Sequence, residues 1–336
     1  MPPHAVSTRG PWFEGWYYRL YDPARQVSIV VIATSAYQDG APVPGYLATL
    51  IQLPDESSPR TDEAYPTDHR VRRLSPPRVA SGARDESFVW STSEAELSES
   101  RVLIRQSALQ LEIQAHERRA WPDWLGLGPW GLLNLIPGLP LYWHVDNTGG
   151  RASYRLTDHR GDLPVVIEGE GFLHQEKNWG EVFPKAWMWL QGLSSDGEAS
   201  LAVAGGLLDL RLINVNSFVV GFRKGRDAYL FSPPSDPSTQ FQFRSNSCAG
   251  EFELEATNRD YRMTLKAIAP PDSFSYVSIP TDSGYQANGG IESFRAKIRV
   301  DVYRNDFFSR RRLESFTFDN AALEFGAAYM LACAPQ

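Results

Sequence analysis

Hydrophobic and polar residues alternate with a period of two along much of this chain. Alternation of this kind predicts β-strands that bury one face and expose the other. It is found in residues 27–37, 101–107, 109–117, 200–212, 218–222, 239–245, 251–256, 261–269 and 296–304. Turn residues separate nearly all of these segments. The pattern therefore predicts an all-β protein built from meandering antiparallel strands.

Two segments depart from this pattern. Residues 93–103 are compatible with a short helix, although no stretch of ten or more residues shows a full helical stripe. The polar, proline-containing residues 53–70 predict a long surface loop. Neither segment changes the predicted fold class.

The chain also contains a weak internal repeat. Residues 14–40 and residues 185–212 share one order of features, which is an aromatic strand, a short turn and a long apolar strand. The interval between them is too long for a propeller or a solenoid, so we expect two β-barrels or sandwiches in tandem. Closing each sheet would remove its exposed edges. We assign the first domain to residues 1–165 and the second to residues 166–336.

Composition and charge narrow the class of protein. The 336 residues are enough for two domains, and a hydrophobic content of 42% is typical of globular proteins. A net charge of -7 disfavours nucleic acid and acidic molecules as partners. The only cysteines, Cys248 and Cys333, predict neither a disulfide framework nor a thiol metal site, and they favour a reducing compartment. Residues 1–10 resemble neither a secretory signal nor a transit peptide, so we expect a cytoplasmic protein.

Motifs for cofactors are weak. Residues 126–131, GLGPWG, have the glycine spacing of a dinucleotide loop, but Pro129 lacks a backbone donor and no strand-helix unit surrounds the motif. The histidines form no H-x-x-x-H pair, and no acidic cluster has the spacing of a calcium loop. We therefore expect no cofactor and no metal.

Residues 124–143, called the uncharged segment below, carry no charged side chain. A segment of this length suggests a membrane span, but its prolines and glycines disfavour the helix that a span requires. Two interpretations stay open. The segment is either a buried apolar loop, or a lid that covers a lipophilic pocket or touches a membrane surface.

Two further segments combine aromatic and polar side chains. In a strand through residues 185–192, Trp187, Trp189 and Gln191 share one face. Just before it, Glu176 and Asn178 alternate with Lys177 and Trp179. These groups either converge on a ligand, or form a Glu-Lys ion pair beside ordinary core tryptophans.

The second such segment, residues 11–23, surrounds one carboxyl group with aromatic rings. Alternation places Glu14 on the same face as Trp12, Trp16 and Tyr18. Desolvation in such an aromatic wall would make Glu14 a usable acid. The alternative is an arginine partner that keeps Glu14 ionised and structural.

Four blocks of this sequence resemble a known family. FEGWYYRLYD (13–22), YWHV (142–145), EKNWGEVFPKAWMWLQG (176–192) and ALEFG (322–326) look like the signature blocks of the tocopherol cyclase family. The blocks occur in order over most of the chain. The resemblance implies two lipocalin-like antiparallel β-barrel domains, an architecture shared with carotenoid hydratases and fungal pericyclases, with a ligand cavity inside or between them.

The resemblance also implies an activity. A tocopherol cyclase protonates the prenyl double bond of a prenylated hydroquinone, and the phenol oxygen captures the tertiary cation to close a chroman ring without a cofactor. We expect Glu14 or Glu176 to donate the proton, and His144 or Asn178 to orient the phenol oxygen and accept its proton. The expected substrate-binding residues are Trp16, Tyr18, Trp143, Lys177, Trp179, Trp187, Trp189 and Gln191.

Other functions stay open at this stage. The chain could be a related pericyclase or hydratase that acts on a polyene, polyketide or terpenoid, or a non-catalytic protein that binds lipophilic ligands. In each case the expected partner is a lipophilic prenylated aromatic or terpenoid molecule and not a nucleic acid. Peripheral contact with a membrane is a further expectation.

Overall fold

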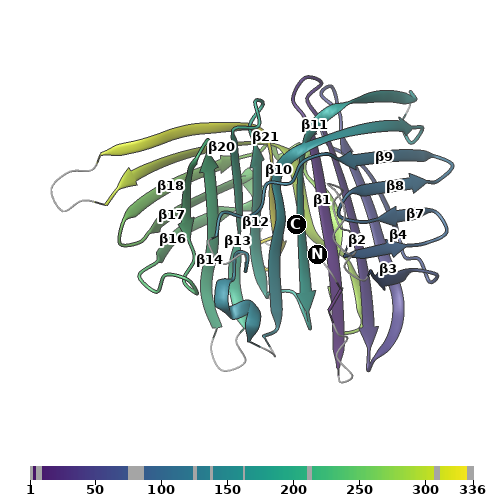
Figure 1. The fold of residues 1–336 in the computed structure, drawn as a ribbon, viewed down its shortest axis with the longest axis horizontal. Helices are drawn as coiled ribbons and strands as arrows, with labels where there is room; N and C mark the ends of the chain where they lie inside the picture. Colours follow the sequence, from purple (N-terminus) through teal and green to yellow (C-terminus); the bar gives the residue numbers. More distant parts are fainter. Residues whose placement is uncertain are drawn as a thin grey trace, which may run out of the picture.

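The strands of this protein form two antiparallel sheets that follow one another along the chain (Figure 1). The structure is a computed structural model, and it describes residues 3–4, 10–74, 87–123, 127–136, 139–161, 163–209, 214–305 and 311–330. The helices of this part are the short 3-10 helices η1 (Gly131–Leu135), η2 (Ser247–Ala249) and η3 (Pro271–Ser273). The predicted fold class, all-β with two tandem lipocalin-like units, is confirmed.

The first sheet has the strand order β4-β3-β2-β1-β11-β10-β9-β8-β7-β6-β5. Its strands are β1 (Pro11–Asp22), β2 (Val27–Gln38), β3 (Ala41–Gln52), β4 (Arg60–Ala64), β5 (Arg70–Arg73), β6 (Phe88–Ser91), β7 (Ala95–Leu97), β8 (Arg101–Arg105), β9 (Leu109–Ala115), β10 (Leu141–Asp158) and β11 (Val165–Gly180).

The second sheet has the order β15-β14-β13-β12-β21-β20-β18-β17-β16, and β19 pairs with β20. Its strands are β12 (Ala186–Leu193), β13 (Ala199–Asp209), β14 (Asn214–Lys224), β15 (Asp227–Phe231), β16 (Gln240–Asn246), β17 (Glu251–Thr257), β18 (Tyr261–Ile268), β19 (Ser275–Thr281), β20 (Gly284–Arg304) and β21 (Arg312–Ala327).

The two sheets share one connectivity. In the first sheet the opening strand β1 pairs with the closing strand β11, and in the second sheet β12 pairs with β21 in the same way. The internal repeat of the sequence reflects this shared connectivity, because residues 14–40 contain most of β1 and all of β2 whereas residues 185–212 contain β12 and β13, which hold the equivalent places in the second sheet. The change of sheet falls between Gly180 and Ala186. A change of sheet does not by itself define a domain, so the boundary between residues 165 and 166 stays a prediction.

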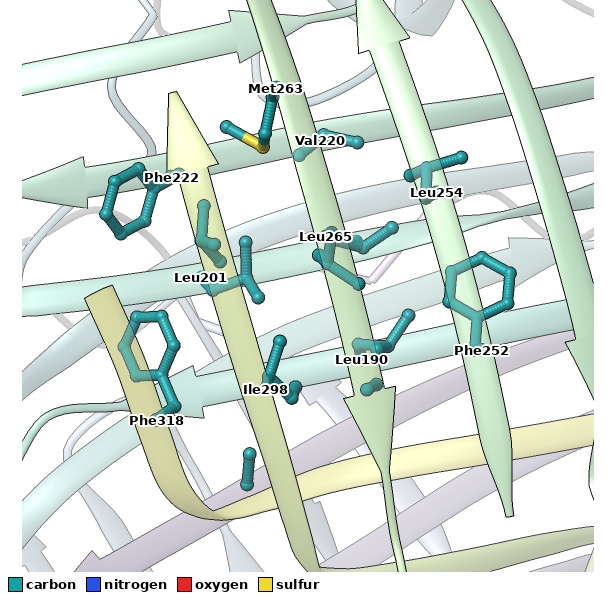
Figure 2. Close-up of a cluster of buried hydrophobic side chains, with 14 of the residues drawn as sticks. Leu190, Leu201, Val220, Phe222, Phe252, Leu254, Met263, Leu265, Ile298 and Phe318 are labelled. Carbon is teal, nitrogen blue, oxygen red and sulfur yellow. The ribbon is translucent and has the colours of Figure 1, made fainter. Parts of the chain in front are cut away.

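Within the described residues, buried apolar side chains form four clusters, of which two lie inside the sheets and two lie between them. The first sheet curls around one core, which includes Trp16, Tyr18 and Trp90. The second sheet surrounds another core, in which Leu190, Phe252 and Ile298 come from strands that cross one another (Figure 2). A third layer joins Tyr17 of the first sheet to Trp189 of the second. Together with a fourth cluster, in which Trp143 of the first sheet meets Val219 of the second, this layer forms the interface between the sheets and positions the candidate site.

The structure corrects two expectations about local structure. Residues 93–103 form β7 and β8 rather than a helix, since Ala95 and Leu97 face the core while Glu96 faces solvent. Strand pairing with β6 and β9 overrides any helical tendency there. Residues 53–70 are not only a loop, because residues 60–64 of this range form β4, which pairs with β3.

Cys248 is disulfide-bonded. The sequence did not predict this state, which is rare in reducing compartments.

Candidate active site

A cavity with mostly apolar walls lies between the two sheets. Strands β1, β2, β3, β10 and β11 line it from one side, and β12, β13, β14, β19, β20 and β21 line it from the other. The space not filled by atoms measures about 1220 Å³, part of which is open to solvent. Its walls carry the aromatic rings of Phe13, Tyr17, Tyr46, Trp130, Trp143, Phe183, Trp187, Trp189 and Phe218. A cavity with such walls suits a lipophilic ligand.

Three carboxyl groups face this apolar cavity, and we call Glu176, Glu292 and Glu324 the acid cluster. They come from β11, β20 and β21, which are far apart in the sequence. Glu292 and Glu324 are directly opposite each other across the β20-β21 ladder. Carboxyl groups so close together in a nonpolar site disfavour simultaneous ionisation.

Glu324 has the properties of an acid that is protonated near neutral pH. Burial raises its pKa to about 7, the nearby Glu176 carboxyl adds to the rise, and a hydrogen bond from Trp187 opposes it. That bond runs from the indole Nε1 of Trp187 to Oε1 of Glu324 over 2.7 Å. Within the described residues, Oε2 of Glu324 has no hydrogen bond, so this oxygen is the one available to a ligand in the cavity.

Glu292 is held more deeply. Burial raises its pKa well above the usual range and the Glu324 carboxyl adds to this, while Tyr17 and Arg19 lower it in part. The hydroxyl of Tyr17 donates to Oε1 of Glu292 over 2.6 Å. Glu292 and Glu324 together therefore keep a proton in the cavity at neutral pH.

Glu176 differs because it accepts two hydrogen bonds at one oxygen. Its Oε2 lies 3.1 Å from the indole Nε1 of Trp189 and 3.0 Å from Nε2 of His174. Trp189 also packs edge-on against Tyr17 at a centroid distance of 4.8 Å. Donors directed at a carboxylate suit a group that accepts a proton, whereas Glu324 suits a group that donates one.

The ALEFG block has a physical basis in this geometry. It supplies Glu324 and also Gly326, which lies beside the indole of Trp187. A Cβ atom at Gly326 would lie 1.8 Å from a ring atom of Trp187, so only glycine leaves room for the ring. The flat contact of Trp187 on Gly326 thus places the indole N–H against Glu324.

Glu14 lies on the other face of β1, away from the cavity. Its Oε1 is 3.1 Å from the ammonium of Lys177 and 3.2 Å from Nδ1 of His4. The same ammonium lies 5.1 Å and 5.2 Å from the ring centroids of Trp16 and Trp179. Burial lowers the pKa of Lys177 to about 8, although Glu14 partly opposes this. The partner of Glu14 is therefore a lysine and a histidine, in place of the arginine considered from the sequence.

The remaining predicted site residues divide between the two faces. Those that line the cavity with Glu176 are Asn178, Trp16, Trp143, Trp187 and Trp189, although the ring of Trp16 stacks on Phe88 in the first core. Those outside the cavity lining, in addition to Glu14, are His144, Tyr18, Lys177, Trp179 and Gln191. Burial lowers the pKa of His144, which lies across the ladder from Lys177. The structure thus brings together about half of the predicted set.

Three residues of the cavity, Tyr17, Glu292 and Glu324, were not predicted from the sequence. Glu324 belongs to the ALEFG block, and a carboxyl group in an otherwise apolar strand segment could have indicated a functional residue. Tyr17 lay inside GWYY, but the strand face assigned to the site was the opposite one. Glu292 occurs in the plain strand sequence IESF and carries no comparable signal.

The described part of the uncharged segment covers one end of the cavity. Trp130, just before η1, lines the cavity, and η1 lies beside the ends of β13 and β14 (Figure 1). Leu132, Leu135 and Ile136 are exposed to solvent at 58%, 65% and 47%. In the part of the chain that the structure describes, no helix has the length and hydropathy needed to cross a membrane. These exposed side chains do not fit a fully buried loop, while a lid over the cavity and contact with a membrane both stay predictions.

Comparison with known proteins agrees with the resemblance seen in the sequence. A family model described as tocopherol cyclase-like matches residues 169–327. This part of the chain is thus similar to tocopherol cyclase-like proteins. The match includes Glu176, Glu292 and Glu324, and it supports a cyclase or a related catalytic role. No curated protein sequence matches the chain at a significant level.

Solved structures with the same fold cover almost the whole chain. CghA is 12% identical with a TM-score of 0.61, and the match covers 97% of this chain and 94% of CghA. CghA with Sch210972 matches with the same identity and TM-score, covering 98% and 95%. A protein provisionally named AttH from Nitrosomonas europaea is 11% identical with a TM-score of 0.50, covering 96% and 94%. At these identities the likeness establishes the fold alone.

Proposed function

We propose that this chain is a cofactor-independent cyclase that closes a chroman-type ring in a prenylated hydroquinone. One observation carries the proposal, which is the acid cluster of Glu176, Glu292 and Glu324 inside an aromatic cavity between the sheets. The reaction needs a proton, a dry site, rings that stabilise a cation and a carboxylate that accepts a proton. Each requirement has a candidate group in the cavity.

The proposed reaction begins with Glu324. Its carboxylic acid transfers a proton to the prenyl double bond, and the tertiary carbocation forms between the rings of Trp187 and Trp189. An indole face stabilises a desolvated cation by about 2 kcal/mol. General acid catalysis of this kind typically contributes about 10²–10⁴-fold to the rate.

Ring closure follows at the phenol oxygen. The oxygen attacks the cation and forms the carbon–oxygen bond, while its proton passes to the carboxylate of Glu176. Glu324 is left as a carboxylate, and return of a proton from Glu176 restores the starting state. The reaction is therefore a net isomerisation that consumes no water and no redox equivalent. Glu292 keeps the cluster protonated, and Glu14 and His144 have no part in the chemistry.

The test is turnover of a prenylated hydroquinone, followed by mass spectrometry of the product. Cyclisation leaves the mass unchanged, hydration adds one water, and a carrier returns its ligand intact. We expect an isomer of unchanged mass from the natural sequence. A hydrated product or an unaltered ligand would contradict the cyclase and would favour the hydratase or the non-catalytic binder.

Variants assign the roles within the cluster. Glu324→Gln should lower turnover by about two orders of magnitude or more while binding persists. Glu176→Gln should also lower turnover, whereas Glu168→Gln on the exposed part of β11 serves as the matched control. Normal turnover in both Glu324→Gln and Glu176→Gln would show that the carboxyl groups do not carry the reaction.

A further inference from the structure

Four cavity residues lie at one level across four neighbouring strands. Trp143 of β10 is the partner of Asn178 on β11, Asn178 is the partner of Gly15 on β1, and Gly15 is the partner of Thr34 on β2. All four line the cavity. We call Trp143, Asn178, Gly15 and Thr34 the head-group row. Glu176 and Tyr17 occupy the next level on the same face, because they lie two residues further along β11 and β1.

The head-group row contains polar groups that the protein leaves unused. The indole Nε1 of Trp143 is buried and has no hydrogen-bond partner within the described residues. The side chain of Asn178 likewise makes no hydrogen bond in this part of the chain, although it faces the cavity. Leaving a buried polar group unpaired costs about 1–3 kcal/mol. Asn178 is half-buried, so a ligand with a polar group at this level can provide the hydrogen-bond partner that its side chain lacks.

The row also has space for such a group. Gly15 stands between Asn178 and Thr34 and contributes no side chain to the cavity wall. The nearest atom to a Cβ built there is Oγ1 of Thr34 at 3.4 Å, which is ordinary contact. The protein itself therefore does not require glycine at this position, and a bound ligand is a reason for the open space.

The spacing of the two levels identifies a ligand class. Residues i and i+2 of a strand are about 6.7 Å apart, so a six-membered ring that lies along β11 can place one oxygen at Glu176 and its para oxygen at Asn178. We propose that the head-group row binds the second ring oxygen of a para-dihydroxy aromatic substrate through the amide of Asn178, between the ring of Trp143 and the hydroxyl of Thr34. This inference rests on the proposed function, since it assigns the first ring oxygen to Glu176.

The test compares two ligands and three variants in equilibrium binding, followed by quenching of tryptophan fluorescence. The ligands are a prenylated para-hydroquinone and the same prenylated monophenol without the second hydroxyl. The natural sequence should bind the dihydroxy ligand about 10-fold more tightly, which is the scale of one additional hydrogen bond. Asn178→Leu should abolish this preference and change monophenol affinity by less than about 3-fold.

Two further variants keep the result interpretable. Gly15→Ala adds one methyl group that the protein accommodates. This substitution should lower the affinity for the dihydroxy ligand more than the affinity for the monophenol. Glu168→Gln is the control and should leave both affinities unchanged. Three results would overturn the proposed role of the head-group row. They are equal affinity of the natural sequence for both ligands, an equal loss of affinity for both ligands in Asn178→Leu, and no binding of either ligand.

The outcomes separate this inference from the cyclase proposal. Loss of the preference in Asn178→Leu, without any cyclised product from the natural sequence, would support the head-group row and reject the cyclase. Cyclised product with no preference between the ligands would support the cyclase and reject the head-group row.

Discussion

The protonation of Glu324 makes stability depend on pH in a way that one substitution should remove. Its pKa is raised to about 7 in the folded protein, mainly by burial, whereas a glutamate in an unfolded chain titrates near 4.5. The folded state therefore binds more protons than the unfolded state between these two values. Stability should be greatest below the unfolded pKa and should fall as pH rises toward the folded pKa.

The size of this effect follows from the shift. Each pKa unit corresponds to about 1.4 kcal/mol, so a rise of this size corresponds to about 3 kcal/mol of unfolding free energy lost between pH 4.5 and pH 7. In Glu324→Gln this contribution disappears, because an amide does not titrate. The substitution also removes a carboxyl group that raises the pKa of Glu292, so the loss of pH dependence should be at least this large.

The assay is urea unfolding at a series of pH values from 4 to 8, with the unfolding free energy taken from each curve. Glu168→Gln, at an exposed position, is the matched control and should retain the full pH dependence. Titrating groups away from the acid cluster affect the natural sequence and the variant alike, so the difference between the two curves reports Glu324 together with its effect on Glu292. A difference that changes by less than about 1 kcal/mol over this range would refute the buried, protonated carboxyl.

Three other predictions concern separate parts of the molecule. Glu14→Gln should destabilise the protein by about 3–5 kcal/mol in urea unfolding, because it leaves buried Lys177 without its carboxylate partner. Adding Lys177→Met to this variant should restore much of the lost stability. An unchanged urea midpoint in Glu14→Gln alone would contradict a stabilising ion pair. Gly326→Ala should lower the stability of the protein by about 1–3 kcal/mol, because the added methyl group clashes with Trp187. Gly15→Ala should change the stability by less than about 0.5 kcal/mol. Equal effects of the two substitutions in thermal unfolding would show that the clash at Gly326 does not occur. The double variant Leu132→Asp/Leu135→Asp should bind lipid vesicles more weakly in a sedimentation assay, or turn over long-chain substrates more slowly. Unfolding of this variant would instead favour a buried loop.

The sequence alone determined the fold class and most strands of this protein. Alternation with a period of two is a local property, and segments such as 27–37, 251–256 and 261–269 became β2, β17 and β18 with small changes at their ends. The repeat of aromatic strand, turn and apolar strand was also visible, because it reflects the equivalent positions of β1 and β12. The resemblance to a family supplied the expected chemistry and the expected cavity.

Only the tertiary structure decided which face of each strand meets the other sheet. Alternation separates Glu14 from Tyr17 and Glu176 from Lys177, but it does not state which of each pair faces the cavity. The residues predicted from the sequence lie on both faces of β11, and those on β1 were assigned to the face of Glu14, which is away from the cavity. Glu292 and Glu324 reach Glu176 only because the second sheet packs against the first, more than a hundred residues later in the chain. The acid cluster is a product of that packing, since no local pattern specifies contact between separate sheets.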